Sequence, residues 1–358
     1  MKPAALAPNL IDHFYRGGDR IARLRGIEQT SDFQPEEWLA ATVSRADHGD
    51  IGLARTVDGD LLRDLVAGDP AAWVGLDHAL AANPADTGIL VKLLDARQRL
   101  PVHVHPSRDF ATSHLDCPYG KTEAWLILDA EPGSAVHLGW KEPVDRDELD
   151  RRRDAQDSEW MLSRMNRIEV SRGMGVLVPA GTVHAIDGGI FLAEVQEPTD
   201  FSIVLEWSVT TSTREESHLG LGFDTVMPAV SVDALGPDEL DALVSRNELS
   251  ARSPRAESLL PTAADPYFRV LHAAPPVSHG VTLDGGFAAA LVLEGSGTLV
   301  GGSPYGDPAA ADEVEYTSGQ VFAVPASFGP WEVRGTGSVL IASPGAGWPR
   351  SLADGGIV

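Results

Sequence analysis

The segment GMGVLVPAGTVH, residues 173–184, decides the fold that we expect of this chain. Its apolar first half has the composition of a β-strand, the proline and glycine that follow favour a turn, and His184 starts the next apolar stretch. The same spacing of glycine, proline and alanine returns in GQVFAVPA, residues 319–326, where Pro330 takes the place of the histidine. We therefore expect two related β units, of which only the first carries this histidine.

Further segments of strand composition surround both copies at short intervals. They are TGILVKLLDA (87–96), AWLILDA (124–130), GIFLAEVQE (189–197), FSIVLEWSV (201–209), FAAALVLEGSGTLV (287–300) and SVLIASP (338–344). The 36 glycines and 25 prolines supply turns between such strands. The pattern indicates a mainly β protein built as sandwiches or barrels.

Three stretches interrupt the β pattern. Residues 60–84 carry apolar groups at helical spacing, broken by Pro70, and the charge-dense residues 142–165 also predict a helix. We expect the apolar residues 160–162 to cover the mouth of the first β unit. Residues 232–265 predict a short helix and a linker. The chain is accordingly divided into a first unit with its N-terminal and helical segments (1–231), a helical linker (232–265) and a second unit (266–358).

The composition narrows the possible partners. The net charge of −24 argues against nucleic acid and anionic membranes, because both attract clustered Lys and Arg. The single cysteine, Cys117, excludes an internal disulfide. No run approaches the roughly 18 apolar residues that span a bilayer. We therefore expect a cytoplasmic protein whose partner is a small molecule; the sequence is silent on its oligomeric state.

Four residues have the types and spacing of a metal site. His103 and His105 lie two apart in a β-like stretch, so both imidazoles point to the same side of the strand. Glu123 opens an apolar strand, where burial of a carboxylate requires a partner such as a metal ion. His184 follows the turn described above. Together they predict a site for one divalent metal ion.

These residues resemble the two sequence motifs of the cupin superfamily. The first motif is HxH followed by a glutamate, and the second is glycine, five residues, PxG, two residues and histidine. The second motif is matched at every position of 173–184, whereas the separation of 18 positions between His105 and Glu123 exceeds that of compact cupins. The resemblance implies two jelly-roll β-barrels, a metal-binding barrel with helical insertions and a degenerate barrel without metal ligands.

A narrower resemblance explains the long spacing. The segments VHVHPS (102–107), YGKTEAWLILDA (119–130), VPAGTVHAIDGG (178–189) and EVQEPTDFSIVLEW (194–207) are similar to class I mannose-6-phosphate isomerases, also called type I phosphomannose isomerases. The resemblance implies a metal-dependent sugar isomerase, an intramolecular oxidoreductase of carbohydrate metabolism. Such an enzyme converts mannose-6-phosphate to fructose-6-phosphate through a cis-enediol.

The resemblance also implies roles for individual residues. Zn²⁺ is the metal favoured in the family, and Fe, Mn and Ni also suit three imidazoles and a carboxylate. Glu194 matches an acid near the family's site and is the candidate base, although it could instead pair with Lys121. Lys121 is expected to hold substrate hydroxyls or phosphate. Trp125 and Arg108 are further candidates for substrate contacts, with a place in the core as the alternative for Trp125.

The chain departs from the family at three positions. His103 stands where the family has glutamine, Pro101 where it has a serine that contacts phosphate, and Val204 where it has an arginine near the sugar. A phosphate clamp could come from other basic residues, namely Arg16, Arg20, Arg108 and Lys141. Two alternatives therefore stay open. One is an isomerase or epimerase of a non-phosphorylated sugar such as mannose, and the other is a non-catalytic, metal-bearing cupin that binds sugar.

Overall fold

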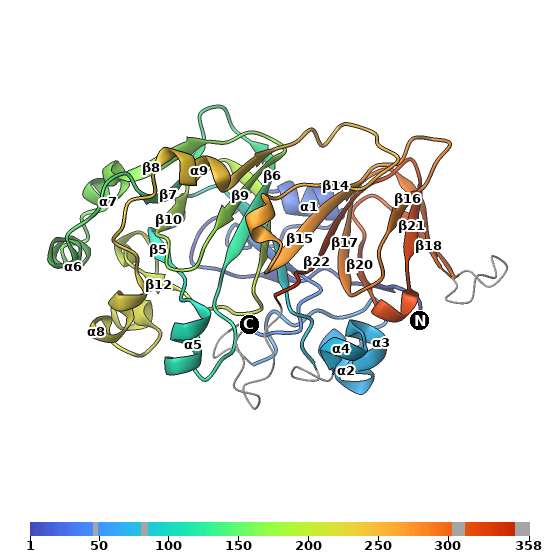
Figure 1. The fold of residues 1–358 in the computed structure, drawn as a ribbon, viewed down its shortest axis with the longest axis horizontal. Coiled ribbons are helices and arrows are strands. Elements are labelled where there is room, and N and C mark those ends of the chain that lie inside the picture. The colour runs from blue at the N-terminus through green and yellow to red at the C-terminus, as the bar shows by residue number, and fades with distance from the viewer. Residues whose placement is uncertain (46–48, 80–84, 303–311, 348–358) are drawn as a thin grey trace.

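The structure, a computed structural model, describes residues 1–45, 49–79, 85–302 and 312–347 (Figure 1). Its strands form four antiparallel sheets, which we number I to IV in the order in which they stack. Sheet I contains β12 (Ile203–Val204), β5 (His103–Val104), β10 (His184–Ile186), β7 (Ala135–Trp140) and β8 (Met165–Glu169). Sheet II contains β13 (Val244–Arg246), β9 (Met174–Val178), β6 (Glu123–Ala130), β11 (Ile190–Gln196), β4 (Leu90–Ala96), β3 (Glu36–Leu39) and β2 (Leu10–Ile11).

The other two sheets belong to the C-terminal part of the chain. Sheet III contains β1 (Ala4–Ala5), β20 (Val321–Val324), β17 (Ala288–Glu294), β22 (Ser338–Pro344), β15 (Phe268–Ala273) and β14 (Glu257–Ser258). Sheet IV contains β16 (Val281–Leu283), β21 (Trp331–Gly335), β18 (Ser296–Gly301) and β19 (Glu313–Thr317).

The two sheet pairs repeat one topology. Strands β4 to β11 occupy the neighbour orders β9-β6-β11-β4 and β5-β10-β7-β8, and strands β15 to β22 occupy β20-β17-β22-β15 and β16-β21-β18-β19. Each strand of the first set therefore has a counterpart eleven places later in the second. The repeated glycine–proline segment lies at equivalent places, on β9 with its following turn and on β20 with its following turn. The expected mainly β fold of two jelly-roll barrels is confirmed.

The helices lie outside the sheets. They are α1 (Arg20–Arg25), α2 (Leu62–Gly68), α3 (Pro70–Val74), α4 (Leu76–Ala79), α5 (Arg108–His114), α6 (Arg146–Asp154), α7 (Ser158–Arg164), α8 (Phe223–Val226) and α9 (Pro237–Ala242). The predicted break at Pro70 is confirmed, because this residue starts α3; the end of that predicted segment, 80–84, lies outside the described residues. Helix α5 occupies the long interval between His105 and Glu123. None of the helices in the described ranges is long and apolar enough to span a membrane.

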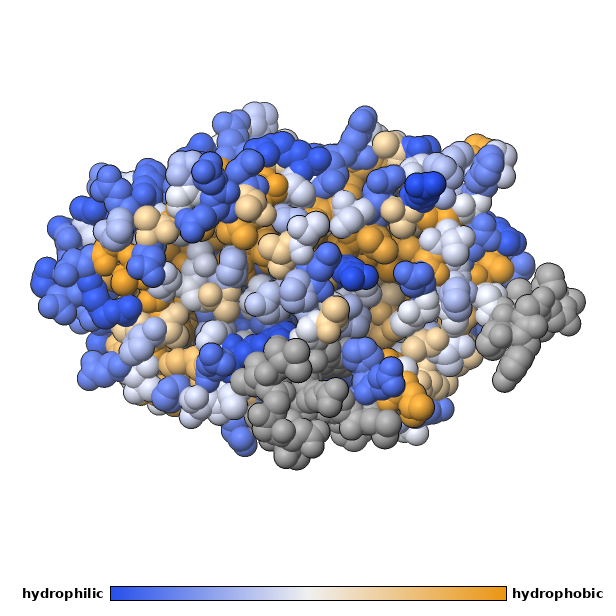
Figure 2. Space-filling view, in the orientation of Figure 1, coloured by the Kyte–Doolittle hydropathy of each residue, from blue (hydrophilic) through white to orange (hydrophobic). Residues whose placement is uncertain are grey.

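The charged insertion covers a different surface from the one expected. Met161 of α7 and Leu149 of α6 pack with Val104 on the outer face of sheet I, away from the barrel interior. Side chains alternate along β5, so the neighbours of His103 and His105 must point outward. The expectation that this insertion covers the barrel mouth is therefore wrong. Except for the buried Arg153, the charges of α6 and α7 are at least partly exposed and form the hydrophilic left end of the surface (Figure 2).

The segment 232–265 is more ordered than a linker. Besides α9 it contains β13, which pairs with β9 of sheet II, and β14, which pairs with β15 of sheet III. In addition, β1 at the N-terminus pairs with β20 of sheet III. The segments on either side of the two barrels thus extend the central sheets. The division of the chain at 231 and 265 stays a prediction, and residues 348–358 lie outside the described ranges.

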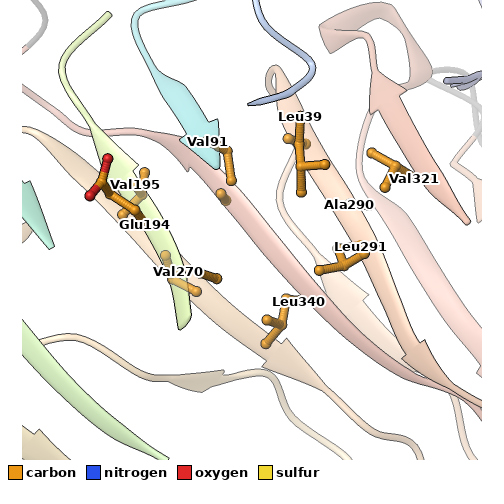
Figure 3. Close-up of a pocket in the computed structure, with 12 residues that line it drawn as sticks. Leu39, Val91, Glu194, Val195, Val270, Ala290, Leu291, Val321 and Leu340 are labelled. Atoms are coloured by element: carbon orange, nitrogen blue, oxygen red, sulfur yellow. The ribbon is translucent and has the colours of Figure 1, made fainter. Parts of the chain in front are cut away.

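Sheets II and III pack against each other through apolar side chains (Figure 3). Leu39, Val91 and Val195 of sheet II face Val270, Leu291 and Leu340 of sheet III. The carboxylate of Glu194 points away from this contact, because it alternates with Val195 along β11. One face of sheet II therefore packs the two halves together, while its other face lines the first barrel.

This contact gives a prediction on stability. Leu340→Ala leaves a cavity between sheets II and III and should lower the free energy of unfolding by about 2–4 kcal/mol. The matched control is Leu76→Ala, because Leu340 is 4% exposed and Leu76 is 63% exposed. Urea unfolding followed by fluorescence measures both. Equal losses in the two variants would contradict the proposed packing.

Candidate metal centre

Two backbone features bring the histidines together. His103 and His184 are paired residues of the antiparallel strands β5 and β10, so their side chains emerge side by side on one face of sheet I. Gly181 in the preceding turn has φ +85°, which favours glycine, and its N–H donates to the His105 carbonyl at 2.8 Å. The turn predicted from the sequence is therefore tied directly to the strand that carries the other two imidazoles.

Glu123 reaches the histidines from sheet II. It opens β6, and Trp125 on the same face donates its indole N–H to Glu123 Oε1 at 3.0 Å. The ring of Trp125 also lies edge-on to His184, with 5.6 Å between the ring centroids. The tryptophan is fully buried, so it holds the carboxylate beneath the histidines.

The hydrogen bonds of the three imidazoles define their protonation. Each ring places Nδ1 next to a backbone carbonyl oxygen: His103 next to Pro101 at 2.8 Å, His105 next to Phe201 at 2.7 Å and His184 next to Thr182 at 2.8 Å. A carbonyl only accepts, so each Nδ1 carries the proton and each Nε2 presents a lone pair. Burial lowers the pKa of His105 and of His184 to about 3, so neither ring is charged near neutral pH.

The lone pairs converge on one point. His103 Nε2 and His184 Nε2 are 2.9 Å apart, and His105 Nε2 is 3.0 Å from Glu123 Oε2. The ligand atoms of the three histidines all lie within 4.8 Å of one another. Facing lone pairs repel unless a cation lies between them, and the buried Oε2 of Glu123 has no hydrogen-bond partner. Neutral imidazoles and a carboxylate in this arrangement fit a divalent metal ion.

Lys121 lies at the edge of this group. Its Nζ is 3.0 Å from His105 Nε2 and 3.3 Å from Glu123 Oε2. Burial opposes ionisation of Glu123, but the neighbouring charge of Lys121 holds the pKa of this carboxyl well below its usual range. The loop is fixed from behind, since the N–H of Thr122 donates to Glu197 at 2.9 Å. Lys121 therefore contacts both one of the three histidines and the carboxylate of this cluster.

A cavity of about 70 Å³ borders this cluster at His103 and Lys121. A second group of charges lines the cavity. The buried Lys92 Nζ is 3.6 Å from Glu194, 3.9 Å from Glu36 and 3.9 Å from Asp200. Tyr15 donates its hydroxyl to Glu36 at 2.8 Å. Lys92 thus holds three carboxylates at the wall of the cavity.

The carboxylates of this group differ in their affinity for a proton. Burial and the charge of Glu123 raise the pKa of Glu194 to about 7. For Glu36, burial acts in the same direction, but His13, Lys92 and two hydrogen bonds together lower its pKa to about 2. Burial opposes the charge on Lys92, yet the surrounding carboxylates raise its pKa above the ordinary value. Glu194 is therefore the group suited to accept and return a proton near neutral pH.

The other residues proposed for substrate contacts lie elsewhere. Arg108 donates to Glu197 at 2.6 Å and to the Gly347 carbonyl at 2.7 Å, and it does not line the cavity. Arg20 is paired with Asp95 at 2.6 Å, and Lys141 donates to a backbone carbonyl. Val204 does line the cavity, beside His103. Contacts of these basic residues with a phosphate stay predictions.

Sequence reasoning missed the second charged group. Lys92 stands in the apolar run LVKLLDA, residues 90–96, and the argument that singled out Glu123 applies to it equally. A charged side chain in a fully buried strand needs partners. Glu36 and Asp200 gave no comparable signal, because both lie next to turns in which acidic residues are common.

Comparisons with known proteins agree with this geometry. No family model matches the chain. It is 28% identical over 297 residues to "Probable mannose-6-phosphate isomerase GmuF" of Bacillus subtilis, which covers 78% of this chain and 84% of that protein. Among solved structures, the mannose 6-phosphate isomerase of Bacillus subtilis aligns with 96% of this chain and 99% of its own, with a TM-score of 0.68 and 20% identity.

A second solved structure has the same fold. A mannose 6-phosphate isomerase bound with zinc and yttrium aligns with 96% of this chain and 100% of its own, with a TM-score of 0.70 and 15% identity. The resemblance to mannose-6-phosphate isomerases in sequence and in fold is thereby confirmed. On its own chemistry, the three-histidine cluster fits a metal site.

The pKa of Glu194 predicts a pH dependence of stability in the metal-free protein. Because this pKa rises from 4.5 to about 7 on folding, the folded chain binds a proton that the unfolded chain has released. The free energy of unfolding therefore falls as the pH rises from 4.5 to 7, by up to about 3 kcal/mol at full linkage.

Glu194→Gln should remove this fall, which urea unfolding at pH 5 and pH 8 measures. Glu142→Gln, at an exposed position, is the control and should leave the slope unchanged. The assignment fails if Glu194→Gln and the wild type lose stability equally between the two pH values.

Proposed function

We propose that this protein is a metal-dependent mannose-6-phosphate isomerase that forms fructose-6-phosphate through a cis-enediol. The observation that carries the proposal is the convergence of three neutral imidazoles and Glu123 next to Glu194, whose pKa is about 7. An aldose–ketose isomerase needs this pair of features, an electrophile for the two substrate oxygens and a base for the proton between C1 and C2. The names of the sequence relatives support the same reaction.

In this proposal one divalent ion is held by His103, His105, Glu123 and His184. When bound, the ion supplies Lewis-acid polarisation of the substrate oxygens. Zn²⁺ is the preferred identity, supported by the zinc-bound isomerase of similar fold and by the nitrogen-rich ligand set. The carbonyl partners of the three Nδ1 atoms fix the rings, so that every Nε2 stays available as a ligand.

The protein's own residues divide the remaining tasks. Glu194 accepts the proton from C2 of the open-chain aldose and returns it to C1, which yields the ketose. Lys92 keeps the Glu194 carboxylate in place at 3.6 Å, and Lys121 donates to a substrate hydroxyl or phosphate. The cavity is smaller than the roughly 300 Å³ of an ordinary ligand pocket, so the sugar must displace Lys121 from its contacts with His105 and Glu123.

One observation favours a second candidate, an isomerase of a non-phosphorylated sugar such as mannose. Among the described residues, no arginine lines the cavity, and Val204 is present there. Of its two lysines, Lys92 faces the carboxyl groups of Glu36, Glu194 and Asp200, and Lys121 faces Glu123. An uncharged sugar avoids the repulsion that a phosphate dianion would meet from these carboxylates.

The metal site predicts a defined metal content. The protein should hold one divalent ion per chain, and His184→Ala should lower this content at least about tenfold, since one of four ligands is lost. The matched control is His114→Ala, an exposed histidine on α5 that should keep full metal content. Inductively coupled plasma mass spectrometry after dialysis gives the ratio. Full metal content in His184→Ala would overturn the ligand assignment.

The reaction predicts turnover that depends on Glu194. Metal-loaded protein should convert mannose-6-phosphate to fructose-6-phosphate, EDTA should abolish this, and Glu194→Gln should lower kcat by about 10²–10⁴-fold with unchanged metal content. Glu142→Gln should keep full activity. Free mannose, assayed in parallel by the same ketose readout, tests the second candidate. Sugar binding without turnover of either substrate would leave only the non-catalytic, metal-bearing sugar-binding protein.

A further inference from the structure

The second barrel has a cavity at the place that corresponds to the metal centre of the first. In sheet I, His184 at the start of β10 pairs with His103, and in sheet IV, Trp331 at the start of β21 pairs with Leu283. Glu123 pairs with the residue before Pro179, and Ala288 pairs with the residue before Pro325. Leu283, Ala288 and Trp331 thus stand where His103, Glu123 and His184 stand in the first barrel.

The same pairing locates the counterparts of the second charged group. Val195 pairs with Val91 in sheet II, and Ala342 pairs with Val270 in sheet III. The adjacent pair in sheet II is Lys92 with Glu194, and the adjacent pair in sheet III is Leu271 with Ile341. Leu271 is therefore the counterpart of Lys92, and Ile341 is the counterpart of Glu194. All five counterparts are apolar, and all five line the cavity of the second barrel.

The cavity of the second barrel is larger than that of the first. It measures about 420 Å³ in the second barrel against about 70 Å³ beside the metal cluster. Ala288 is far shorter than glutamate, and Gly285 and Gly286 line the same space without side chains. A volume of this size lies within the range of small-molecule pockets. The metal ligands are gone, but the space they would fill remains open.

The polar residues surround an apolar floor. Arg269 and Ser343 come from β15 and β22, Asp284 follows β16, and Asp77 comes from α4, which lies beside this end of the second barrel (Figure 1). Arg269 is half exposed and lies 3.7 Å from Asp265, so its charge is already partly balanced. Asp77 and Asp284 outnumber Arg269, so the rim carries net negative charge and disfavours anionic ligands. The site therefore suits an uncharged molecule with hydroxyl groups for the rim and an apolar face for Trp331 and Leu283.

We propose that the cavity of the second barrel is a metal-independent binding site for an uncharged glycoside, with its apolar aglycone on the floor and its hydroxyls at the rim. This site is separate from the proposed isomerase centre and does not depend on it. The floor provides burial of apolar surface, and the rim provides Arg269, Asp284 and Ser343 as partners for hydroxyl groups.

The probe is 4-nitrophenyl α-D-mannopyranoside, titrated into the full chain by calorimetry. Its blocked anomeric carbon cannot open to an aldehyde, so the isomerase reaction does not consume it. We expect one site, bound equally by metal-loaded and EDTA-treated protein. Arg269→Ala and Ser343→Ala should each weaken binding about three- to tenfold, since each removes one polar partner. Ala288→Leu, which fills the floor, should abolish binding.

Two variants serve as matched controls. Arg255→Ala removes an exposed arginine outside the cavity, and His184→Ala alters only the first barrel; both should bind the probe like the wild type. No binding by the wild type overturns the proposal. It is also overturned if His184→Ala or EDTA abolishes binding while Arg269→Ala and Ser343→Ala leave it unchanged, because the probe then occupies the first barrel.

Discussion

The contact on which the rest of the first barrel depends is the approach of two unprotonated nitrogens, His103 Nε2 and His184 Nε2, to 2.9 Å. Two lone pairs at this distance repel, and backbone carbonyls fix the rings so that neither can turn its N–H toward the other. The turn at Gly181 and the pairing of β5 with β10 hold the backbone in the same position. A divalent cation between the two nitrogens would replace this repulsion with attraction. The fold therefore holds both rings in an arrangement that metal binding requires.

The same two strands of sheet II serve the site and the packing of the two halves. Along β4, Lys92 points into the first barrel and Val91 into sheet III; along β11, Glu194 and Val195 do the same. A shift of one residue in either strand would bury the charges between the sheets and turn the valines toward the cavity. The register is therefore fixed from both sides, by apolar contact on one face and by paired charges on the other.

The sequence predicted what is encoded locally. The glycine–proline turn, the pair His103 and His105, and the repeat that implies a second barrel are short patterns with direct geometric meaning. The group around Lys92 was missed because its partners come from segments far apart in the chain, where only the folded sheet brings Glu36 and Asp200 together. The insertion of α6 and α7 was expected at the barrel mouth. Its apolar residues indicate that it packs against another surface, but they do not identify that surface.

The two barrels show how few side chains separate two kinds of cavity on one topology. In the first, Glu123 and the histidines bury a charge and several lone pairs, and neighbours such as Lys121 offset part of the cost of this burial. In the second, Ala288, Leu283 and Trp331 occupy the same strand positions and belong to an ordinary apolar core. Backbone pairing and strand order are common to both, so the chemistry of each cavity is decided by the residues at these positions and not by the fold. A jelly roll with this strand order can thus keep an open cavity without these polar residues, because the barrel is closed by backbone pairing, which does not require histidine or glutamate side chains.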